Sequence, residues 1–286
     1  MSKAKKAGNS NSVFHRFCRH KLAVAGAVFI VLLCLCAVFA PVIAPCDPNE
    51  ITPDFACPPS LQHLLGTDQL GRDVLSRIIF ASRISLSVGI GSVIVTAVIG
   101  IILGLVSGYF GKAVDMVIMR ITDVFMSFPV IILLMALAAI AGSGVINMIL
   151  IIGLVTWPPI CRLVRGSVLS LRQMDYVRSA VSSGISTPRI LAMHILPNTL
   201  DSILVNATFG VASSIMLESS LSFLSLGIAP PTASWGNMLM EAQSLSVLKD
   251  MPWLWIPPGL IILLTVLSFN FVGDGLRDAL DPKHIR

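Results

Sequence analysis

The chain has 286 residues, of which 55% are hydrophobic and 12% are charged, and its mean hydropathy is +0.86. A soluble domain of this length usually carries about 25% charged residues, so this chain lacks the polar surface to cover itself in water. The composition therefore excludes an ordinary water-soluble globular protein and predicts an all-α integral membrane protein.

The first 21 residues form a basic tail without an acidic residue. Its charges are Lys3, Lys5, Lys6, Arg16, Arg19 and Lys21. An apolar run follows at 22–44, longer than the hydrophobic region of a typical signal peptide, which predicts a retained first transmembrane helix. The positive-inside rule places the tail in the cytoplasm. Because no aromatic or folded element accompanies the basic residues, no nucleic acid is expected as a partner.

The segment 45–84 is predicted to be extracytoplasmic, since 41–70 contains four acidic residues and no Lys or Arg. Cys46 and Cys57 lie in it and could form a disulfide in an oxidising compartment. Otherwise the six cysteines of the chain show no metal-binding pattern. Within 70–84, apolar residues recur at helical spacing, which predicts an amphipathic helix in the membrane interface. An extension of the next span fits that pattern equally well.

Five more apolar stretches are long enough to cross a membrane, which makes six spans in total. They lie at 85–107, 114–141, 145–165, 200–226 and 254–273, and together with their connections they form a transmembrane core at 85–273. Trp157, Pro158 and Pro159 should kink the fourth span. An even number of spans returns the tail at 274–286 to the cytoplasm, in agreement with its Arg277, Lys283 and Arg286.

Small and ionisable residues inside the spans predict contacts between helices. Thr96, Gly100, Gly104 and Gly108 repeat at every fourth position and form a face on which another backbone can approach closely. Arg120 and Asp123 are three residues apart in the third span, so they can pair on one face of that helix.

One carboxylate lies deep in the fifth predicted span. Glu218 stands among serines that include Ser214 and Ser219. An intramembrane carboxylate usually faces a partner or a water-filled cavity. Two interpretations stay open: these three residues line a translocation path, or Glu218 makes a buried hydrogen bond to a neighbouring helix.

The cytoplasmic loop 171–198 is predicted to contain two short helices. Gly184 suits the position just after the first helix, where a left-handed conformation is common. Ser186 or Thr187 can cap the second helix, with Pro188 in its first turn, and Pro197 ends it. Two short capped helices at the membrane face predict a docking site for a cytoplasmic partner.

This loop resembles the EAA loop of the permeases of bacterial ABC importers. Ala180, Gly184, Leu196 and Pro197 match that pattern in register, and His194 belongs to an ending typical of the peptide and nickel branch. The departures are Arg178, Ser179 and Ser183, which replace Glu, Ala and an apolar residue. The missing Glu puts in doubt the salt bridge that it would form with an ATPase, but not the docking.

Three further segments resemble the second permease subunit of dipeptide and oligopeptide importers. They are 65–77 with the sequence LGTDQLGRDVLSR, 221–227, and the C-terminal 269–282. The resemblance therefore extends over nearly the whole chain, with its motifs in the same order.

The resemblance implies a type I ABC importer permease fold with six transmembrane helices in a bacterial inner membrane. It implies a homologous permease as heterodimer partner, two cytoplasmic ATPases that bind ATP and Mg²⁺, and an extracytoplasmic substrate-binding protein. The residues that it assigns to ATPase coupling are Arg178, Ala180, Gly184, Pro188, Arg189, His194, Leu196 and Pro197. Within the same family, the substrate could be a dipeptide, an oligopeptide, nickel, a metallophore or glutathione.

The chain itself is not expected to be an enzyme or to bind a cofactor. Its nearest approach to a phosphate-binding loop is Gly111-Lys112-Ala113, which lacks the hydroxyl that would reach magnesium. No hydrolase or zinc-protease motif occurs.

A secondary transporter driven by an ion gradient is the alternative from a different class. Such a transporter would need no ATPase partner and often shows inverted repeats, which are not evident here. A membrane-embedded enzyme would need clustered catalytic residues, and Glu218 alone does not supply them.

Overall fold

The computed structural model describes residues 15–280, so the outer parts of both basic tails lie outside it. Within that range the secondary structure is helical, apart from one isolated bridge between Thr67 and Asp73. Among the described residues, four helices are long and apolar enough to cross a membrane, and two bent helix pairs raise the number of spans to six if each pair counts once. The helical fold is as the sequence predicted.

The first span is formed by α2 (Lys21–Val38), which the short α3 (Ala40–Ile43) extends. Residues 44–73 then contain no helix, and α4 (Val74–Phe110) follows as a single helix of 37 residues. The Asp73 carboxylate caps α4 by accepting a hydrogen bond from the backbone N–H of Ser76 at 2.8 Å.

The predicted interfacial helix at 70–84 is wrong, because α4 runs through most of it without a break. Val74 and Ile78 are 1% and 5% exposed, and the side chain of Arg77 is 3% exposed. An interfacial helix would leave its charged face in water. Here the Arg77 charge is buried and the helix continues to Phe110, so the alternative interpretation, an extension of the second span, is correct.

Prolines divide the third and fourth spans. The third consists of α5 (Lys112–Ser127) and α6 (Val130–Ala141), which meet at 90°, whereas the sequence predicted one continuous helix at 114–141. Pro129 stands at this break and has no backbone N–H to continue the helix. The fourth consists of α7 (Val145–Thr156) and α8 (Pro158–Leu171), which meet at 45°. The predicted kink at Trp157 is therefore confirmed.

The last two spans are α11 (Leu200–Phe223) and α14 (Pro252–Leu280). Between them lie the short α12 (Trp235–Met240), η3 (Glu241–Gln243) and α13 (Leu245–Asp250). α14 continues beyond the predicted end at residue 273 and includes the beginning of the predicted tail at 274–286.

The small-residue face of α4 packs against another helix, as the sequence predicted, and that helix is α8. A Cβ atom on Gly100 would lie 2.8 Å from Ile160, and one on Gly104 would lie 2.7 Å from the backbone oxygen of Cys161. At Gly108 the contact is with Val168 at 2.7 Å. Side chains larger than hydrogen are excluded along this contact, so the second and fourth spans are held backbone to backbone.

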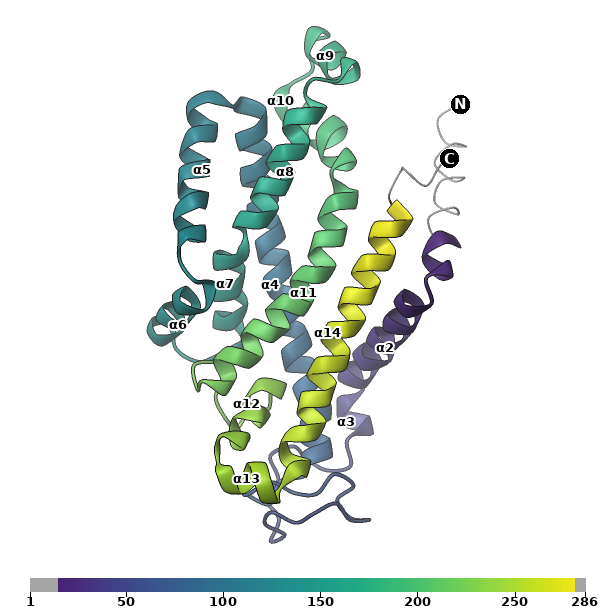
Figure 1. Ribbon diagram of the computed structural model, residues 1–286, viewed down its shortest axis with the longest axis vertical. Coiled ribbons are helices and arrows are strands. Elements are labelled where there is room, and N and C mark those ends of the chain that lie inside the picture. Colours follow the sequence, from purple (N-terminus) through teal and green to yellow (C-terminus); the bar gives the residue numbers. More distant parts are fainter. Residues whose placement is uncertain (1–14, 281–286) are drawn as a thin grey trace.

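The short helices gather at the two ends of the bundle (Figure 1). The helical loop between α8 and α11 lies at one end, whereas α12, α13 and the segment between α3 and α4 lie at the other. The loop that the sequence predicts to dock a partner is thus separated from α12 and α13 by the length of the spans.

Candidate coupling loop and translocation pocket

The loop between α8 and α11 contains two short helical units. The first is α9 (Asp175–Ser182), and the second is α10 (Thr187–Ile190), which continues as the π-helical η1 (Leu191–Ile195) and the 3₁₀-helical η2 (Leu196–Asn198). Pro188 lies in the first turn of α10 and Pro197 lies in η2. Ser186 occupies the N-cap position of α10 without a capping hydrogen bond from its side chain.

Gly184 ends α9 as the sequence predicted. Its φ of +74° lies in the left-handed region, where a side chain is unfavourable. The backbone N–H of Gly184 donates to Val181 O at 3.0 Å, and that of Ile185 donates to Ala180 O at 3.2 Å. These two bonds form a Schellman motif, which fixes the angle between α9 and α10.

An apolar cluster attaches the loop to the spans. Val177 and Ala180 from α9, with Ile190 and Ile195 from the second unit, are at most 6% exposed. They belong to one buried cluster with residues of α4, α8 and α11, namely Leu105, Ile160, Val164, Val168 and Ile203. Because such a close-packed cluster transmits displacement, a force on the loop reaches three spans.

The opposite side of the loop is open to solvent. Arg178, Pro188 and Arg189 are exposed, as are Gly184 and Pro197, whereas His194 and Leu196 are half-buried. Tyr176 and Val181 are 44% and 52% exposed on α9. One face of the loop is therefore buried and attaches it to the spans, and the other face is exposed to solvent and carries both apolar and basic residues.

Ion pairs connect the spans next to the loop. Arg162 of α8 donates to the Asp123 carboxylate of α5 at 2.6 Å, and Arg165 pairs with Asp115. The predicted pair of Arg120 with Asp123 is wrong, because the Asp123 carboxylate pairs with Arg162 of α8 instead. The Arg172 guanidinium also donates to the Gly108 carbonyl at 3.1 Å.

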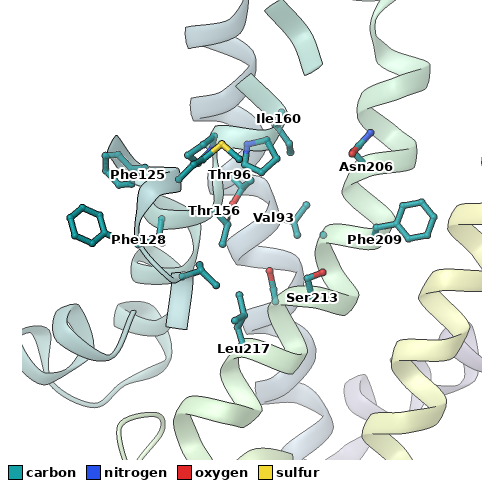
Figure 2. A pocket seen from close by; sticks show the side chains of 17 residues that line it. Val93, Thr96, Phe125, Phe128, Thr156, Ile160, Asn206, Phe209, Ser213 and Leu217 are labelled. Carbon is teal, nitrogen blue, oxygen red and sulfur yellow. Dashed lines mark hydrogen bonds between the residues drawn. The ribbon is translucent and has the colours of Figure 1, made fainter. Parts of the chain in front are cut away.

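A pocket of about 460 Å³ lies in the middle of the bundle. Seen in Figure 2, Asn206 and Ser213 project from α11, while Phe125 and Phe128 lie on the opposite side. Most of the lining is apolar, and no lining residue is charged. The polar groups are Thr96, Thr156, Asn206, Ser213 and Ser214. Of the three residues predicted for a path, only Ser214 lines this pocket.

Glu218 is buried and supports the structural interpretation. Its carboxylate accepts hydrogen bonds from Ser222 at 2.8 Å, from Ser85 of α4 at 3.3 Å and from Ser219 at 3.5 Å. It is 0% exposed and absent from the pocket lining. Through Ser85, Glu218 therefore makes the buried hydrogen bond to a neighbouring helix, while the assignment of Glu218, Ser214 and Ser219 to a translocation path stays a prediction.

The sequence missed most of the pocket lining. Thr156, Asn206 and Ser213 are isolated polar residues in apolar stretches, and a polar residue inside a span is the signal that could have singled them out. Phe125 and Phe128 carried no signal, because their position depends on the break at Pro129.

Cys46 and Cys57 are free in the structure, so the disulfide that the sequence allowed is not formed there. The backbone N–H of Cys46 donates to Ser76 Oγ at 3.1 Å, and that of Cys57 donates to Thr67 Oγ1 at 2.9 Å. The two cysteines are thus fixed by different neighbours. Among the described residues, no group of three or more His, Cys, Asp and Glu is arranged to hold a metal ion.

Comparison with solved structures supports the fold. A chain of the methionine ABC transporter MetNI, in inward-facing conformations, has a TM-score of 0.58 and 19% sequence identity. The match covers 72% of this chain and 97% of that chain. The bundle therefore has the same fold as that chain.

Comparison with sequence families and individual proteins gives the family. Residues 100–286 match the binding-protein-dependent transport system inner membrane component, and residues 10–62 match the N-terminal TM domain of oligopeptide transport permease C. The di/tripeptide permease DppC of Pseudomonas aeruginosa is 42% identical, over 93% of this chain and 90% of DppC. The glutathione permease GsiD of Pectobacterium atrosepticum is 46% identical, over 94% of this chain and 90% of GsiD.

The chain belongs to the family of binding-protein-dependent transport system inner membrane components. It is a multi-pass inner membrane permease subunit of an ABC transporter, a channel-forming type of subunit that works with ATPase partners.

Proposed function

We propose that this chain forms half of the translocation path of an ATP-driven importer of small peptides. A homologous permease supplies the other half, an extracytoplasmic binding protein delivers the substrate, and two cytoplasmic ATPases bind ATP and Mg²⁺. This chain binds no cofactor and does not hydrolyse ATP. The observation that carries the proposal is the structure of the helical loop 171–198. One face of this loop is exposed to solvent, and the other is buried against three spans.

The loop acts as a lever in this proposal. ATP-driven closure of the ATPase pair pulls on the exposed face that includes Arg178 and Arg189. The rigid cap at Gly184 keeps α9 and α10 moving together. The buried cluster passes the movement to the cytoplasmic ends of α4, α8 and α11. The pocket lies between α11 and the bends at Phe128 and Trp157, so tilting α8 and α11 changes its access.

The chemistry of the pocket favours a peptide as substrate. Hydroxyl and amide groups of Thr96, Thr156, Asn206 and Ser213 can exchange hydrogen bonds with peptide groups, and Phe125 and Phe128 accept apolar side chains. Uncharged groups bind such a ligand weakly. Weak binding suits a translocation path, because the path must release its substrate. A bare nickel ion would instead require imidazole, thiolate or carboxylate ligands.

Glutathione is the second candidate, because the relatives include glutathione permeases at 46% identity. It is itself a tripeptide, so the same hydroxyl and amide lining suits it. A competition assay separates the three substrates. It measures the uptake of a labelled dipeptide in the presence of unlabelled glutathione or of nickel.

The coupling loop marks the cytoplasmic side. Arg162, Arg165, Arg172, Arg178 and Arg189 all lie in or next to it, as the positive-inside rule requires of a cytoplasmic face. Figure 1 places this loop opposite the acidic segment between α3 and α4. Both tails are then cytoplasmic.

The test is a pair of matched substitutions of exposed apolar residues. Val181→Asp changes the loop, and Leu245→Asp changes α13 at the opposite end, where the side chain is 77% exposed. We expect Val181→Asp to abolish ATP-dependent peptide uptake and to reduce co-purification of the ATPases, with normal membrane insertion. Leu245→Asp should leave ATPase co-purification unchanged. Equal co-purification in both variants would contradict the lever.

A further inference from the structure

The segment 65–77 ends in a buried group of charges whose function is not explained by coupling or by the pocket. The Asp68 carboxylate accepts a hydrogen bond from Arg72 Nε at 2.6 Å and lies 3.6 Å from Arg77 Nε. Arg72 Nη2 lies 3.9 Å from the Glu241 carboxylate of η3. The side chains of Asp68, Arg72 and Arg77 are at most 9% exposed, and that of Glu241 is 23% exposed.

This charge cluster joins three parts of the outer end of the molecule. Asp68 and Arg72 belong to the segment between α3 and α4, Arg77 belongs to the first turn of α4, and Glu241 follows α12 directly. Arg77 also donates to the Pro48 carbonyl at 3.2 Å, and the Trp253 indole of α14 donates to the Thr67 carbonyl at 3.2 Å. The segment without helices is thereby fixed to both α4 and α14.

α12 is in turn seated on two spans. Its first backbone N–H, from Trp235, donates to Ser85 Oγ of α4 at 3.2 Å. A Cβ atom on Gly236 would lie 2.6 Å from the Cα of Ser219 in α11. Since Glu241 adjoins the last turn of α12, its contact with Arg72 connects the charge cluster to this short helix.

We propose that Asp68, Arg72, Arg77 and Glu241 form an outer clamp that holds α12 and η3 on the foot of α4, and that outward opening during transport requires Glu241 to leave it. The inference rests on the proposed function, because it assigns a step in import to this cluster. Glu241 is a positioning residue in this proposal, since it acts through α12 and does not touch the substrate.

The clamp is sensitive to extracytoplasmic pH. Burial raises the pKa of Glu241 to about 7, Asp68 acts in the same direction, and Arg77 and Arg72 oppose it. α12 and the first turn of α14 contain no ionisable residue, and Lys249 and Asp250 of α13 are exposed. Released into water, Glu241 returns to an ordinary pKa of about 4.3.

Burial disfavours the charged Glu241 carboxylate more than Arg72 and Arg77 favour it, so the pKa of Glu241 is higher in the clamp than in water. Protonation of Glu241 therefore favours the clamped form, in which the neutral carboxyl group stays packed beside Arg72. This stabilisation is complete below about pH 4 and is lost as the pH rises to about 7, where both forms become ionised. Release should therefore increase with pH, by up to about tenfold per pH unit, and level off above about pH 7.

Hydrogen exchange of residues 235–243 measures release directly, in the complete transporter reconstituted in lipid nanodiscs. After correction for the intrinsic pH dependence of exchange, the wild-type rate should rise between about pH 5 and about pH 7 and then stay constant. Glu241→Gln keeps the size of the side chain without its charge, so exchange should stay slow throughout. The matched control is Glu50→Gln on the same outer segment, where the side chain is exposed and the wild-type profile should persist.

ATP-driven uptake should follow the same profile in the wild type and lose it in Glu241→Gln. A flat wild-type exchange profile would overturn the clamp, even if the variant failed to fold. A pH-dependent profile retained by Glu241→Gln would do the same. Absence of ATP-dependent peptide uptake in the wild type would instead contradict the proposed function, and the exchange data would still decide whether the clamp exists.

Discussion

The Arg165 guanidinium and the Asp115 carboxylate form a two-point ion pair that joins α8 to α5. Nε lies 2.5 Å from Oδ1 and Nη2 lies 2.6 Å from Oδ2, and Ser107 of α4 donates to the same carboxylate at 2.5 Å. Three spans thus meet at one carboxylate, close to the loop that we assign to ATPase coupling.

Substitution of this pair tests whether it stabilises the loop end of the bundle. Both side chains are partly exposed, so solvent screening reduces the contribution of the pair, and we expect Arg165→Ala to lower the free energy of unfolding by about 1–2 kcal/mol. Arg165→Lys keeps the charge but not the two parallel bonds and should recover part of the loss. The measurement is thermal unfolding of the purified transporter, with a double-mutant cycle through Asp115→Asn. A coupling energy near zero would show that the pair contributes nothing.

The contact between α4 and α8 gives the second prediction. Gly104→Val would place methyl groups against Cys161 O and Val164, where only hydrogen fits, and should destabilise the bundle by about 1–3 kcal/mol or more. Gly166→Ala is the matched control on α8, because a Cβ atom there meets no atom within 4 Å. It should be neutral or stabilising by up to about 1 kcal/mol. Thermal unfolding of both variants is the check, and equal midpoints would contradict the close approach.

Local chemistry was sufficient to predict the features that depend on one helix or one turn. The kink at Trp157 follows from two adjacent prolines, the end of α9 follows from Gly184, and the contact face of α4 follows from a four-residue repeat that includes Gly104. In each case the residue type restricts the backbone or the distance between backbones, whatever the rest of the fold.

The features that were missed depend on partners far away in the sequence. Asp123 pairs with Arg162 across two helices rather than with Arg120 beside it. The spacing of residues around Arg77 is that of an amphipathic surface helix. The Arg77 side chain is nevertheless buried, in contact with Asp68 and the Pro48 carbonyl. The spacing of residues along one helix cannot show which neighbouring segment lies against it.

Glu218 and Ser213 provide the third prediction, because they lie five residues apart on α11 and have different surroundings. Glu218→Ala removes the acceptor of Ser222, Ser85 and Ser219 inside the bundle and should lower the free energy of unfolding by about 2–3 kcal/mol. Ser213→Ala only changes the pocket wall, so its stability should stay within about 0.5 kcal/mol of the wild type.

The effects on peptide uptake should be the reverse of the effects on stability: large for a substitution of Ser213 and small for one of Glu218. Ser213→Phe fills part of the 460 Å³ pocket and should reduce peptide uptake by roughly tenfold or more, while the unfolding midpoint changes little. Glu218→Gln keeps the shape and an acceptor oxygen, so uptake per folded transporter should stay close to that of the wild type. Uptake is measured in proteoliposomes and divided by the amount of folded protein. A large loss per folded molecule in Glu218→Gln, with normal uptake in Ser213→Phe, would place the path at the carboxylate rather than at the pocket, because a loss counted per folded molecule does not arise from reduced stability.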